Sequence, residues 1–245
     1  MTTIVTGGSR GIGAATVLAL AGAGHDVAFS YRSDADAAQR VCRGAAETGV
    51  RCVSIQADVT RAPDVERLFE AAAELGPVTG LVSNAGLTAH IGDLADTPVE
   101  VIRHVIDVNL LGVVLCARQA ARVMSVRRGG QGGAIVNISS AAATLGSAHE
   151  YVHYAAAKAG VEALTIGLAK ELAEDRIRVN AVSPDIVNTE IHAAAGAPDR
   201  AQRAVSRIPM GRLAEPSEIA PAIVWLLGPE AGYATGAVLR VAGGI

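Results

Sequence analysis

The stretch Thr6-Gly7-Gly8-Ser9-Arg10-Gly11-Ile12-Gly13 decides the fold of this chain. It follows a β-branched run, Thr3 to Thr6, that is typical of a strand, and it opens a segment of helical periodicity. Glycines at such a junction let a pyrophosphate approach the exposed amides at the helix start, where the helix dipole favours negative charge. The spacing Gly-x-x-x-Gly-x-Gly differs from the commoner Gly-x-Gly-x-x-Gly, and a plain tight turn is the alternative interpretation.

The rest of the chain alternates short apolar runs with longer segments of helical periodicity. Strands are predicted at residues 3–6, 26–31, 51–55, 80–83, 134–138, 177–182 and 238–241, and helices at 12–23, 34–48, 62–75, 98–126, 153–174 and 216–227. This alternation requires right-handed crossovers and predicts an α/β fold, a doubly wound Rossmann domain with a seven-stranded parallel sheet and helices on both faces. No linker or repeat divides residues 1–245, which we interpret as a single domain.

Composition agrees with this fold and excludes some partners. Of the 245 residues 50% are hydrophobic and only 3% aromatic, so the core must be built from Ala, Val, Leu and Ile, as in parallel sheets covered by helices. The net charge is −3 and there is no dense basic run beyond Arg127-Arg128, which argues against a nucleic-acid partner.

Cysteines and apolar runs bear on the compartment. Cys42, Cys52 and Cys116 are widely spaced and odd in number, so we interpret them as core residues in a reducing compartment rather than a disulfide frame or a metal site. A strand-like segment follows Met1 almost at once, and no apolar run reaches the ~18 residues needed to cross a bilayer. We therefore expect a cytoplasmic protein with no membrane partner.

The end of the second predicted strand bears on the cofactor. A carboxylate there would hold the ribose hydroxyls of NAD, whereas the 2′-phosphate of NADP requires cations. Arg32 ends this strand, and Arg32 and Arg10 could both face a phosphate, whose oxygens a guanidinium matches. A solvated surface arginine is the alternative interpretation of Arg32.

Asp34 is the competing candidate at this position. Ser33 and Asp36 resemble the cap and the third residue of the next helix, which would leave Asp34 within its first turn. On this reasoning NADP(H) is favoured, and NAD(H) stays possible.

Tyr154 and Lys158 are candidates for proton transfer. In a helix their i,i+4 spacing places both side chains on one face, about 6 Å apart along the axis. A phenol has a pKa near ~10, and a neighbouring ammonium lowers it by stabilising the phenolate. Tyr151 would lie ~10 Å from the lysine along the axis and is expected to line a pocket. Only two of the 21 basic residues are lysines, which favours a requirement at 158 over a chance pair on an exposed helix.

Further polar residues follow the predicted strands. Ser83-Asn84-Ala85-Gly86 ends the fourth strand and Asn137-Ile138-Ser139-Ser140 ends the fifth, so both should lie at the carboxyl edge of the sheet, where ligands bind. Asn109 interrupts an apolar helical segment, and a buried amide there requires hydrogen-bond partners. Each of these signals is weak when taken alone.

Taken together, these residues resemble the short-chain dehydrogenase/reductase family in its NADP-linked carbonyl-reductase branch, which includes 3-oxoacyl-acyl-carrier-protein reductases and glucose 1-dehydrogenases. The resemblance covers essentially the whole chain, and separate matches in the same order argue against coincidence. The matching motifs are Thr6 to Gly13, Asp58-Val59, Asn84-Ala85-Gly86, Tyr154-Ala155-Ala156-Ala157-Lys158 and Val241-Ala242-Gly243-Gly244.

The resemblance implies NADP(H)-dependent hydride transfer between nicotinamide and a carbonyl or secondary alcohol, such as a 3-oxoacyl thioester, a ketone or a sugar-like substrate. It implies that Tyr154 is the general acid in reduction and the base in oxidation, and that Lys158 depresses its pKa and holds the nicotinamide ribose. Ser140 would hydrogen-bond the substrate oxygen, and Asn109 would hold a water in the proton path. Ser140 is preferred to Ser139 because it heads the loop 141–146, as the family's serine does.

The resemblance also implies a set of cofactor contacts and an assembly. Asp58 and Val59 match adenine contacts, residues 84–86 the floor under the ribose, and Val187 and Thr189 the nicotinamide carboxamide loop. A homotetramer is implied, with interfaces formed by the helices that hold Asn109 and Tyr154 and by the C-terminal segment. The expected cofactor-binding residues are Gly7, Ser9, Arg10, Gly11, Ile12, Gly13, Tyr31, Arg32, Asp58, Val59, Asn84, Ala85, Gly86, Tyr154, Lys158, Pro184, Val187 and Thr189.

Asp185 departs from the family, which usually has glycine after Pro184. Asp tolerates positive φ better than most residues, so the loop can form, and we hypothesise that the added charge disfavours anionic substrates. Residues 190–212 are expected to form a helical lid that sets specificity. No metal site is expected, because none of the spacings among His90, His149, His153 and His192 suits a metal. A non-catalytic dinucleotide-binding regulator on the same fold is the alternative function.

Overall fold

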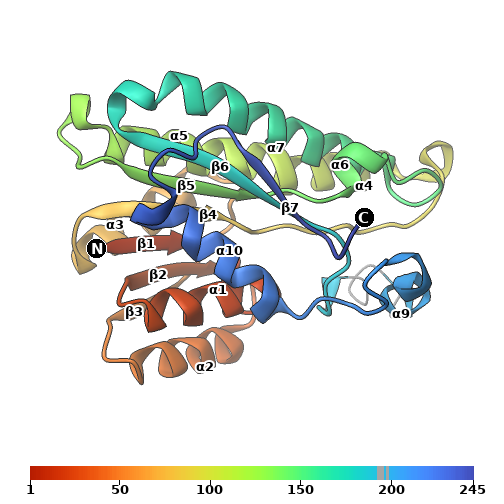
Figure 1. Cartoon of the computed structure of the whole chain (residues 1–245), viewed down its shortest axis with the longest axis horizontal. Coiled ribbons are helices and arrows are strands. Elements are labelled where there is room, and N and C mark those ends of the chain that lie inside the picture. Colours follow the sequence, from red (N-terminus) through yellow and green to blue (C-terminus); the bar gives the residue numbers. More distant parts are fainter. Residues whose placement is uncertain (192–195, 197–198) are drawn as a thin grey trace.

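The computed structural model describes residues 1–191, 196 and 199–245, and its centre is a seven-stranded parallel sheet (Figure 1). The strand order is β3-β2-β1-β4-β5-β6-β7, so the chain winds outward from β1 in one direction and from β4 in the other. This arrangement confirms the predicted doubly wound α/β fold. The strands are β1 (Thr2–Val5), β2 (Asp26–Tyr31), β3 (Cys52–Gln56), β4 (Val78–Ser83), β5 (Gly133–Ile138), β6 (Ile177–Pro184) and β7 (Val238–Val241).

Helices cover both faces of the sheet, because the crossovers between parallel strands must pack their apolar sides on it (Figure 1). One face carries α1 (Gly11–Gly22), α2 (Ala35–Ala46) and α10 (Pro216–Leu227), and the other carries α3 (Ala62–Leu75), α4 (Val99–Ile106), α5 (Gly112–Met124) and α7 (Val152–Glu171). Shorter elements are α6 (Ala142–Leu145), α9 (Arg200–Ala204) and 3₁₀ turns at Leu94–Asp96, Val126–Arg128, Ala173–Asp175, Val205–Arg207 and Pro229–Ala231. Within the described ranges, no helix has the length and apolar character needed to span a bilayer.

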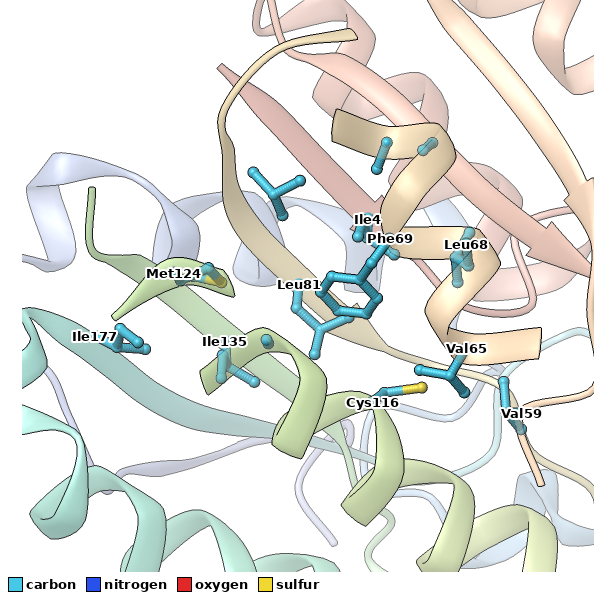
Figure 2. Close-up of a cluster of buried hydrophobic side chains, with 14 of the residues drawn as sticks. Ile4, Val59, Val65, Leu68, Phe69, Leu81, Cys116, Met124, Ile135 and Ile177 are labelled. Carbon is cyan, nitrogen blue, oxygen red and sulfur yellow. The ribbon is translucent and has the colours of Figure 1, made fainter. Parts of the chain in front are cut away.

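The face under α3 and α5 holds a large aliphatic core (Figure 2). Phe69 and Leu68 of α3 pack over Ile4 and Leu81 of the central strands, and all four are at most 2% exposed. Burial of one such side chain contributes roughly 1.5–3 kcal/mol. The sheet is therefore a rigid platform for the loops at its carboxyl edge.

The predicted helix at 98–126 is wrong in one respect, because a π-helical turn, Asp107–Leu111, divides it into α4 and α5. The side-chain amide of Asn109 donates to the carbonyl of Val105 at 2.9 Å, and Val105 is the residue four positions earlier. A side chain that takes the i−4 carbonyl competes with the backbone ladder and widens the turn.

Two of the three cysteines are neighbours in the structure although they are widely spaced in the sequence. All three are free, and Cys116 is fully buried, which raises the pKa of its thiol to about 12. Cys42 of α2 and Cys52 of β3 are half-buried neighbours, with their sulfur atoms 3.5 Å apart. The hydrogen bond between these two sulfur atoms lowers the pKa of Cys42 to about 7. No group of metal-ligating side chains occurs in the described part of the chain.

Candidate active site

A cavity of about 720 Å³ opens at the carboxyl edge of the sheet. It lies beside the point between β1 and β4 where the strand order reverses, which is where open α/β sheets bind ligands. The glycine-rich turn forms one end of its wall, and Ser140, Tyr154 and Lys158 form the other. Every site residue expected from the sequence lines this cavity except Gly13 and Asn109, which lie behind the wall.

The glycine-rich turn has a backbone that side chains would prevent. Gly7 and Gly11 have φ values of +67° and +54°. A Cβ on Gly13 would stand 2.2 Å from the carbonyl oxygen of Gly7 and 2.5 Å from the Nδ2 atom of Asn84. Glycine at position 13 therefore allows α1 to approach the turn closely, and its expected part in cofactor binding stays a prediction.

Asn84 fastens this turn to β4. Its side-chain amide donates to the carbonyl oxygens of Thr6 at 2.9 Å and Gly7 at 3.1 Å. The Thr6 hydroxyl in turn accepts hydrogen bonds from the backbone amides of Asn84 and Ala85, at 2.9 and 3.0 Å. The Asn84 side-chain amide thus holds the backbone of the turn, and the expected position of residues 84–86 under a ribose stays a prediction.

The residues present fit a dinucleotide. Arg10 caps α1 without a side-chain hydrogen bond, so no side chain of the cap occupies the amides of the first turn. Thr189 lies across from these amides, because a Cβ on Gly11 would be 3.2 Å from its Cγ2 atom. An open helix start with left-handed glycines and a facing hydroxyl residue is suited to pyrophosphate.

Both arginines expected to face a phosphate are paired with carboxylates. Arg32 lies 2.8 Å from Asp58, and Arg10 lies 3.4 Å from Glu190. Burial alone would raise the pKa of Asp58, but hydrogen bonds from Thr60 and the charge of Arg32 hold it below its usual value. The positive charge at this end of the cavity is therefore partly neutralised by the protein itself.

The predicted cap of α2 is wrong by one residue. Asp34, not Ser33, caps the helix, and its Oδ1 atom accepts the backbone amide of Ala37 at 2.8 Å. One oxygen of Asp34 therefore satisfies an otherwise unpaired helix amide, which is the usual role of Asp at this position.

Tyr154 and Lys158 share one face of α7 and are both buried, at 8% and 3% exposure. The Lys158 ammonium lies 5.6 Å from the centre of the Tyr154 ring and donates to the carbonyl of Ile138 at 2.8 Å. Burial raises the pKa of Tyr154 to about 12, against a hydrogen bond with Ser140 and the charge of Arg200. Desolvation of the phenolate is the largest effect on this pKa, and the expected depression by Lys158 stays a prediction.

The lysine is affected by the same burial in the opposite direction. Desolvation lowers the pKa of Lys158 to about 8, since burial disfavours the charged form of any group. At neutral pH the lysine is still mostly protonated, and the phenol is fully protonated.

The two serines after β5 point to different partners. The Ser139 hydroxyl is buried and donates to Glu162 at 2.7 Å, away from the tyrosine. Ser140 lines the cavity with Tyr154 and lowers the pKa of its phenol, and the Ser140 Oγ atom accepts the amide of Ala142 at 3.2 Å. Ser140 is therefore the serine that shares the reacting space with Tyr154.

Both the amide nitrogen and the Oδ1 atom of the Asn109 side chain form hydrogen bonds with backbone groups. In addition to Val105, its amide donates to the carbonyl of Leu87 at 2.7 Å, and its Oδ1 atom accepts the Leu87 amide at 3.3 Å. A Cβ on Gly86 would lie 2.8 Å from this Oδ1 atom and 3.6 Å from the Lys158 ammonium. Asn109 thus positions the segment after β4 directly behind the site.

The sequence did not identify Glu150 and Arg200, which form part of the cavity wall. Arg200 of α9 is 7% exposed, lies 4.7 Å above the Tyr151 ring and pairs with Glu150 at 2.6 Å. The Tyr151 and Tyr154 rings meet edge to face, with their centres 5.2 Å apart. Tyr151 lines the cavity as expected. No pattern in the sequence connects residue 150 with residue 200, fifty positions away.

Asp185 fits its loop without left-handed backbone. It is not among the described non-glycine residues with positive φ, and the carbonyl of Pro184 before it accepts the Ala141 amide at 2.7 Å. Burial raises the pKa of Asp185.

The histidines expected near the cavity mouth have other surroundings. His149 is exposed, with its Nδ1 atom 2.8 Å from Asp93, and His153 is buried, which lowers its pKa. Neither His90, His149 nor His153 lines the cavity. His192 falls outside the described residues.

Part of the expected lid at 190–212 is helical. Residues 200–207 form α9 and a 3₁₀ turn, and Ile191, Arg200 and Arg207 line the cavity. Residues 192–195 and 197–198 of this segment lie outside the described part of the chain.

A phosphate-accepting turn and a tyrosine–lysine pair at opposite ends of one cavity define a dinucleotide-linked oxidoreductase. A family model described as "Enoyl-(Acyl carrier protein) reductase" matches residues 7–245. The chain belongs to the short-chain dehydrogenase/reductase family, and it is an oxidoreductase acting on CH–OH groups with NAD(P) as acceptor.

Individual relatives agree with this family. The chain is 44% identical to the uncharacterized oxidoreductase YgfF of Escherichia coli (strain K12), over 98% of each chain. It is 36% identical to the 3-oxoacyl-[acyl-carrier-protein] reductase of Synechocystis sp. (strain ATCC 27184 / PCC 6803 / Kazusa), over 99% of this chain and 95% of the other. A blue fluorescent protein from a metagenomic library, solved in complex with NADPH, superposes with a TM-score of 0.90 at 33% identity, covering 99% of this chain and 96% of that one.

Proposed function

We propose that this protein transfers a hydride between NADP(H) and a carbonyl or secondary alcohol substrate, such as a 3-oxoacyl thioester, a ketone or a sugar-like compound. The observation that carries the proposal is the single cavity that joins the glycine-rich turn to Ser140, Tyr154 and Lys158. A Synechocystis relative that is named for 3-oxoacyl reduction supports the first of these substrate classes.

Tyr154 acts as the acid in carbonyl reduction. Its pKa of about 12 keeps the hydroxyl protonated at neutral pH, so it has a proton to give to the substrate oxygen. Ser140, which lines the same cavity as Tyr154, donates to the same oxygen and fixes its position. The Lys158 ammonium, 5.6 Å from the ring, stabilises the phenolate that remains. In alcohol oxidation Tyr154 takes the proton instead.

The dinucleotide, when bound, supplies or accepts the hydride. The residues that line the cavity would hold it as follows: the glycine-rich turn with Ser9 and Ile12 would bind the pyrophosphate, and Asp58 and Val59 would contact the adenine, with Tyr31 near them. Asn84, Ala85 and Gly86 would form the floor under the ribose, Lys158 would bind the nicotinamide ribose, and Pro184, Val187 and Thr189 would hold the carboxamide.

NADP is proposed over NAD because Arg10 and Arg32 both line the adenine end of the cavity. Their ion pairs with Glu190 and Asp58 reduce this preference without removing it, since each arginine side chain is more than 60% exposed and free to turn. The NADPH complex of a similar protein gives further support.

Three further expectations stay proposals. Residues 190–212 act as a lid, and Asn109 keeps a water near Lys158 in the proton path. The protein assembles as a homotetramer, which is supported by the exposed Leu111 and Ile166 on the helices proposed for its interfaces. A cytoplasmic location stays a prediction.

Substitution of Tyr154 by Phe tests the proposed function. The variant Tyr154→Phe should lower kcat for ketone reduction by about 10²–10⁴-fold, the usual contribution of a general acid, while the Kd for NADPH changes less than about threefold. Tyr233→Phe is the matched control, because Tyr233 is fully exposed and removal of its hydroxyl should leave kcat unchanged. Ketone reduction by Tyr154→Phe at the wild-type rate would refute the assignment.

The same measurements address the alternative of a dinucleotide-binding regulator. A wild-type protein that binds NADPH but reduces no ketone, diketone or acetoacetyl thioester would support the regulator and refute the enzyme.

A further inference from the structure

Cys42 and Cys52 form a pair of thiols at the edge of the sheet, away from the proposed reaction. Cys42 belongs to α2, Cys52 is the first residue of the edge strand β3, and their sulfur atoms are 3.5 Å apart. Both side chains are half-buried at the margin of the core between α2 and the sheet, and neither lines the cavity. Hydride transfer in the cavity therefore does not use either thiol.

The crossover from β2 to β3 brings the two cysteines together. After α2 ends at Ala46, the short connection 47–51 returns the chain to the start of β3. Cys42 lies in the last turns of the helix and so meets the first residue of the strand. Ser54 follows on the same face of β3 as Cys52, because alternate residues of a strand point to the same side.

These neighbours give the two thiols different acidities. Cys52 and, to a smaller extent, Ser54 lower the pKa of Cys42 to about 7 against the rise that burial causes. The pKa of Cys52 is raised, first by its hydrogen bond with Cys42 and then by burial. At neutral pH Cys42 is therefore ionised in a large share of the molecules, while Cys52 keeps its proton.

A partly exposed thiolate beside a protonated thiol has the arrangement of a reactive and a resolving cysteine. A disulfide bond is about 2.05 Å long, so the two sulfur atoms must approach each other by about 1.5 Å to form one. Because both side chains lie at the sheet edge and are only half-buried, side-chain rotation can supply this approach without opening the core.

Cys116 provides the contrast within the same chain. It is fully buried in the opposite core under α3 and α5, and burial raises the pKa of its thiol to about 12. A protonated thiol without access to solvent is neither a nucleophile nor a target for oxidants. We interpret Cys116 as a packing residue.

We propose that Cys42 and Cys52 are a modification site that reacts with a hydroperoxide, such as hydrogen peroxide, and closes to a reversible disulfide between α2 and β3. The Cys42 thiolate first attacks one peroxide oxygen, so that an S–O bond forms, the O–O bond breaks and hydroxide leaves. The Cys52 thiol then attacks the sulfur of this sulfenic acid; the S–S bond forms, the S–O bond breaks and water leaves.

The two steps balance. The thiols lose two electrons and two protons in total, and one hydroperoxide is reduced to water and, for hydrogen peroxide, a second water. Exchange with a small dithiol reverses the bridge. This inference goes beyond the proposed function and does not depend on it, because the state of the thiols is measured without any carbonyl substrate.

Thiol counting tests the proposal on the full chain. The reduced protein is treated with a modest excess of hydrogen peroxide at pH 7, unfolded in urea and labelled with N-ethylmaleimide. We expect the number of labels to fall from three to one and to return to three after dithiothreitol. Trypsin cuts after arginine, so the bridge should join peptides 41–43 and 52–61, while Cys116 stays labelled in peptide 104–118.

Three variants assign the roles of the cysteines. Cys42→Ser should keep both remaining thiols after peroxide, because the reactive thiolate is missing. Cys52→Ser should stop at the sulfenic acid on Cys42, which dimedone traps. Cys116→Ala is the matched control and should form the bridge as wild type does, and circular dichroism checks that each variant is folded.

The joined peptides in wild type and Cys116→Ala, together with dimedone labelling of Cys52→Ser, would support the inference. Three thiols that survive peroxide in the wild type would overturn it. Disulfides that join only separate chains, or oxidation of Cys52 in Cys42→Ser at the wild-type rate, would overturn it as well. None of these results bears on carbonyl reduction, which the Tyr154→Phe experiment tests separately.

Discussion

At the phosphate end of the cavity the backbone itself forms the wall, whereas side chains from distant segments form it at the substrate end. The glycine-rich turn is held by Thr6 and Asn84 through four hydrogen bonds between adjacent strands β1 and β4. The substrate end collects Ser140 from the segment after β5, Tyr154 from α7, Asp185 from the loop after β6 and Arg200 from α9.

The two ends consequently tolerate change differently. A wall formed by backbone requires glycine where two main-chain segments approach closely, because an added side chain would collide with the neighbouring main chain. A wall formed by side chains depends on their chemical groups, so a substitution there changes the reaction or the substrate preference while the fold is retained. This is the reason that one rigid fold accommodates many substrates.

Gly13→Ala gives the largest expected effect and probes the backbone end. Its Cβ would meet the Gly7 carbonyl at 2.2 Å, so either the turn or α1 must shift. We expect the free energy of unfolding to fall by about 2–3 kcal/mol, in the upper range for overpacking, and NADPH affinity to fall strongly. Urea unfolding and calorimetric titration with NADPH measure the two effects.

Gly22→Ala is the matched control, because Gly22 belongs to the same helix and a Cβ there meets nothing within 4 Å. Alanine in a helix should stabilise the protein by up to about 1 kcal/mol. If both substitutions stabilised the protein, close backbone packing would not be the reason for glycine at 13.

Lys158 lies between the phosphate end and the substrate end of the cavity, and the pH dependence of kcat/KM for NADPH tests its role there. Its ammonium loses the proton above about pH 8, while Tyr154 keeps its own to about pH 12. The kcat/KM for NADPH reports the free enzyme, so it should be level below pH 8 and fall about tenfold per unit well above it. Lys158→Arg should remove this descending limb, because guanidinium stays charged.

The same burial gives Lys158 an opposite effect on stability. Its pKa is about 8 in the folded protein and near 10.5 when unfolded, so the unfolded state binds more protons between these values. Burial of the charge opposes folding below pH 8, and this penalty is relieved as pH rises toward 10.5. Lys158→Met removes the buried charge, so its free energy of unfolding should exceed that of wild type. This difference should shrink from pH 7 to pH 10, and a constant difference would contradict the lowered pKa of Lys158.

Asp58→Asn gives the smallest expected effect and tests whether charge pairing limits NADP preference. The substitution releases Arg32 from its 2.8 Å ion pair while the amide oxygen can still accept from Thr60. An exposed ion pair is worth up to about 1 kcal/mol, so NADPH should bind up to about fivefold tighter, with NADH little changed.

A similar pair at the opposite end of β2 serves as the control. Asp26 pairs with Arg51 at 2.6 Å outside the cavity, and Asp26→Asn should leave the ratio of NADPH to NADH affinity unaltered. Weaker NADPH binding in Asp58→Asn would show instead that the contact of Asp58 with the cofactor outweighs its pairing with Arg32.

Local patterns predicted most of the fold because they act over short distances. Strand and helix periods and the glycine turn gave every strand of the sheet, with ends displaced by at most two residues. The errors came from side chains that compete with backbone, namely Asp34 as the cap of α2 and Asn109 at the π-helical turn. Competition of this kind is decided by atomic contacts that a residue pattern does not specify.

The sequence by itself determined the doubly wound sheet, the glycine-rich turn and the tyrosine and lysine on one helix face, because each follows from periodicity or spacing within a few residues. Only the tertiary structure decided how these groups are charged and paired. Burial shifted the pKa values of Tyr154 and Lys158, and the packing of segments far apart in sequence brought Arg200 onto Glu150. Desolvation and pairing depend on all surrounding atoms, and those are known only after the chain has folded.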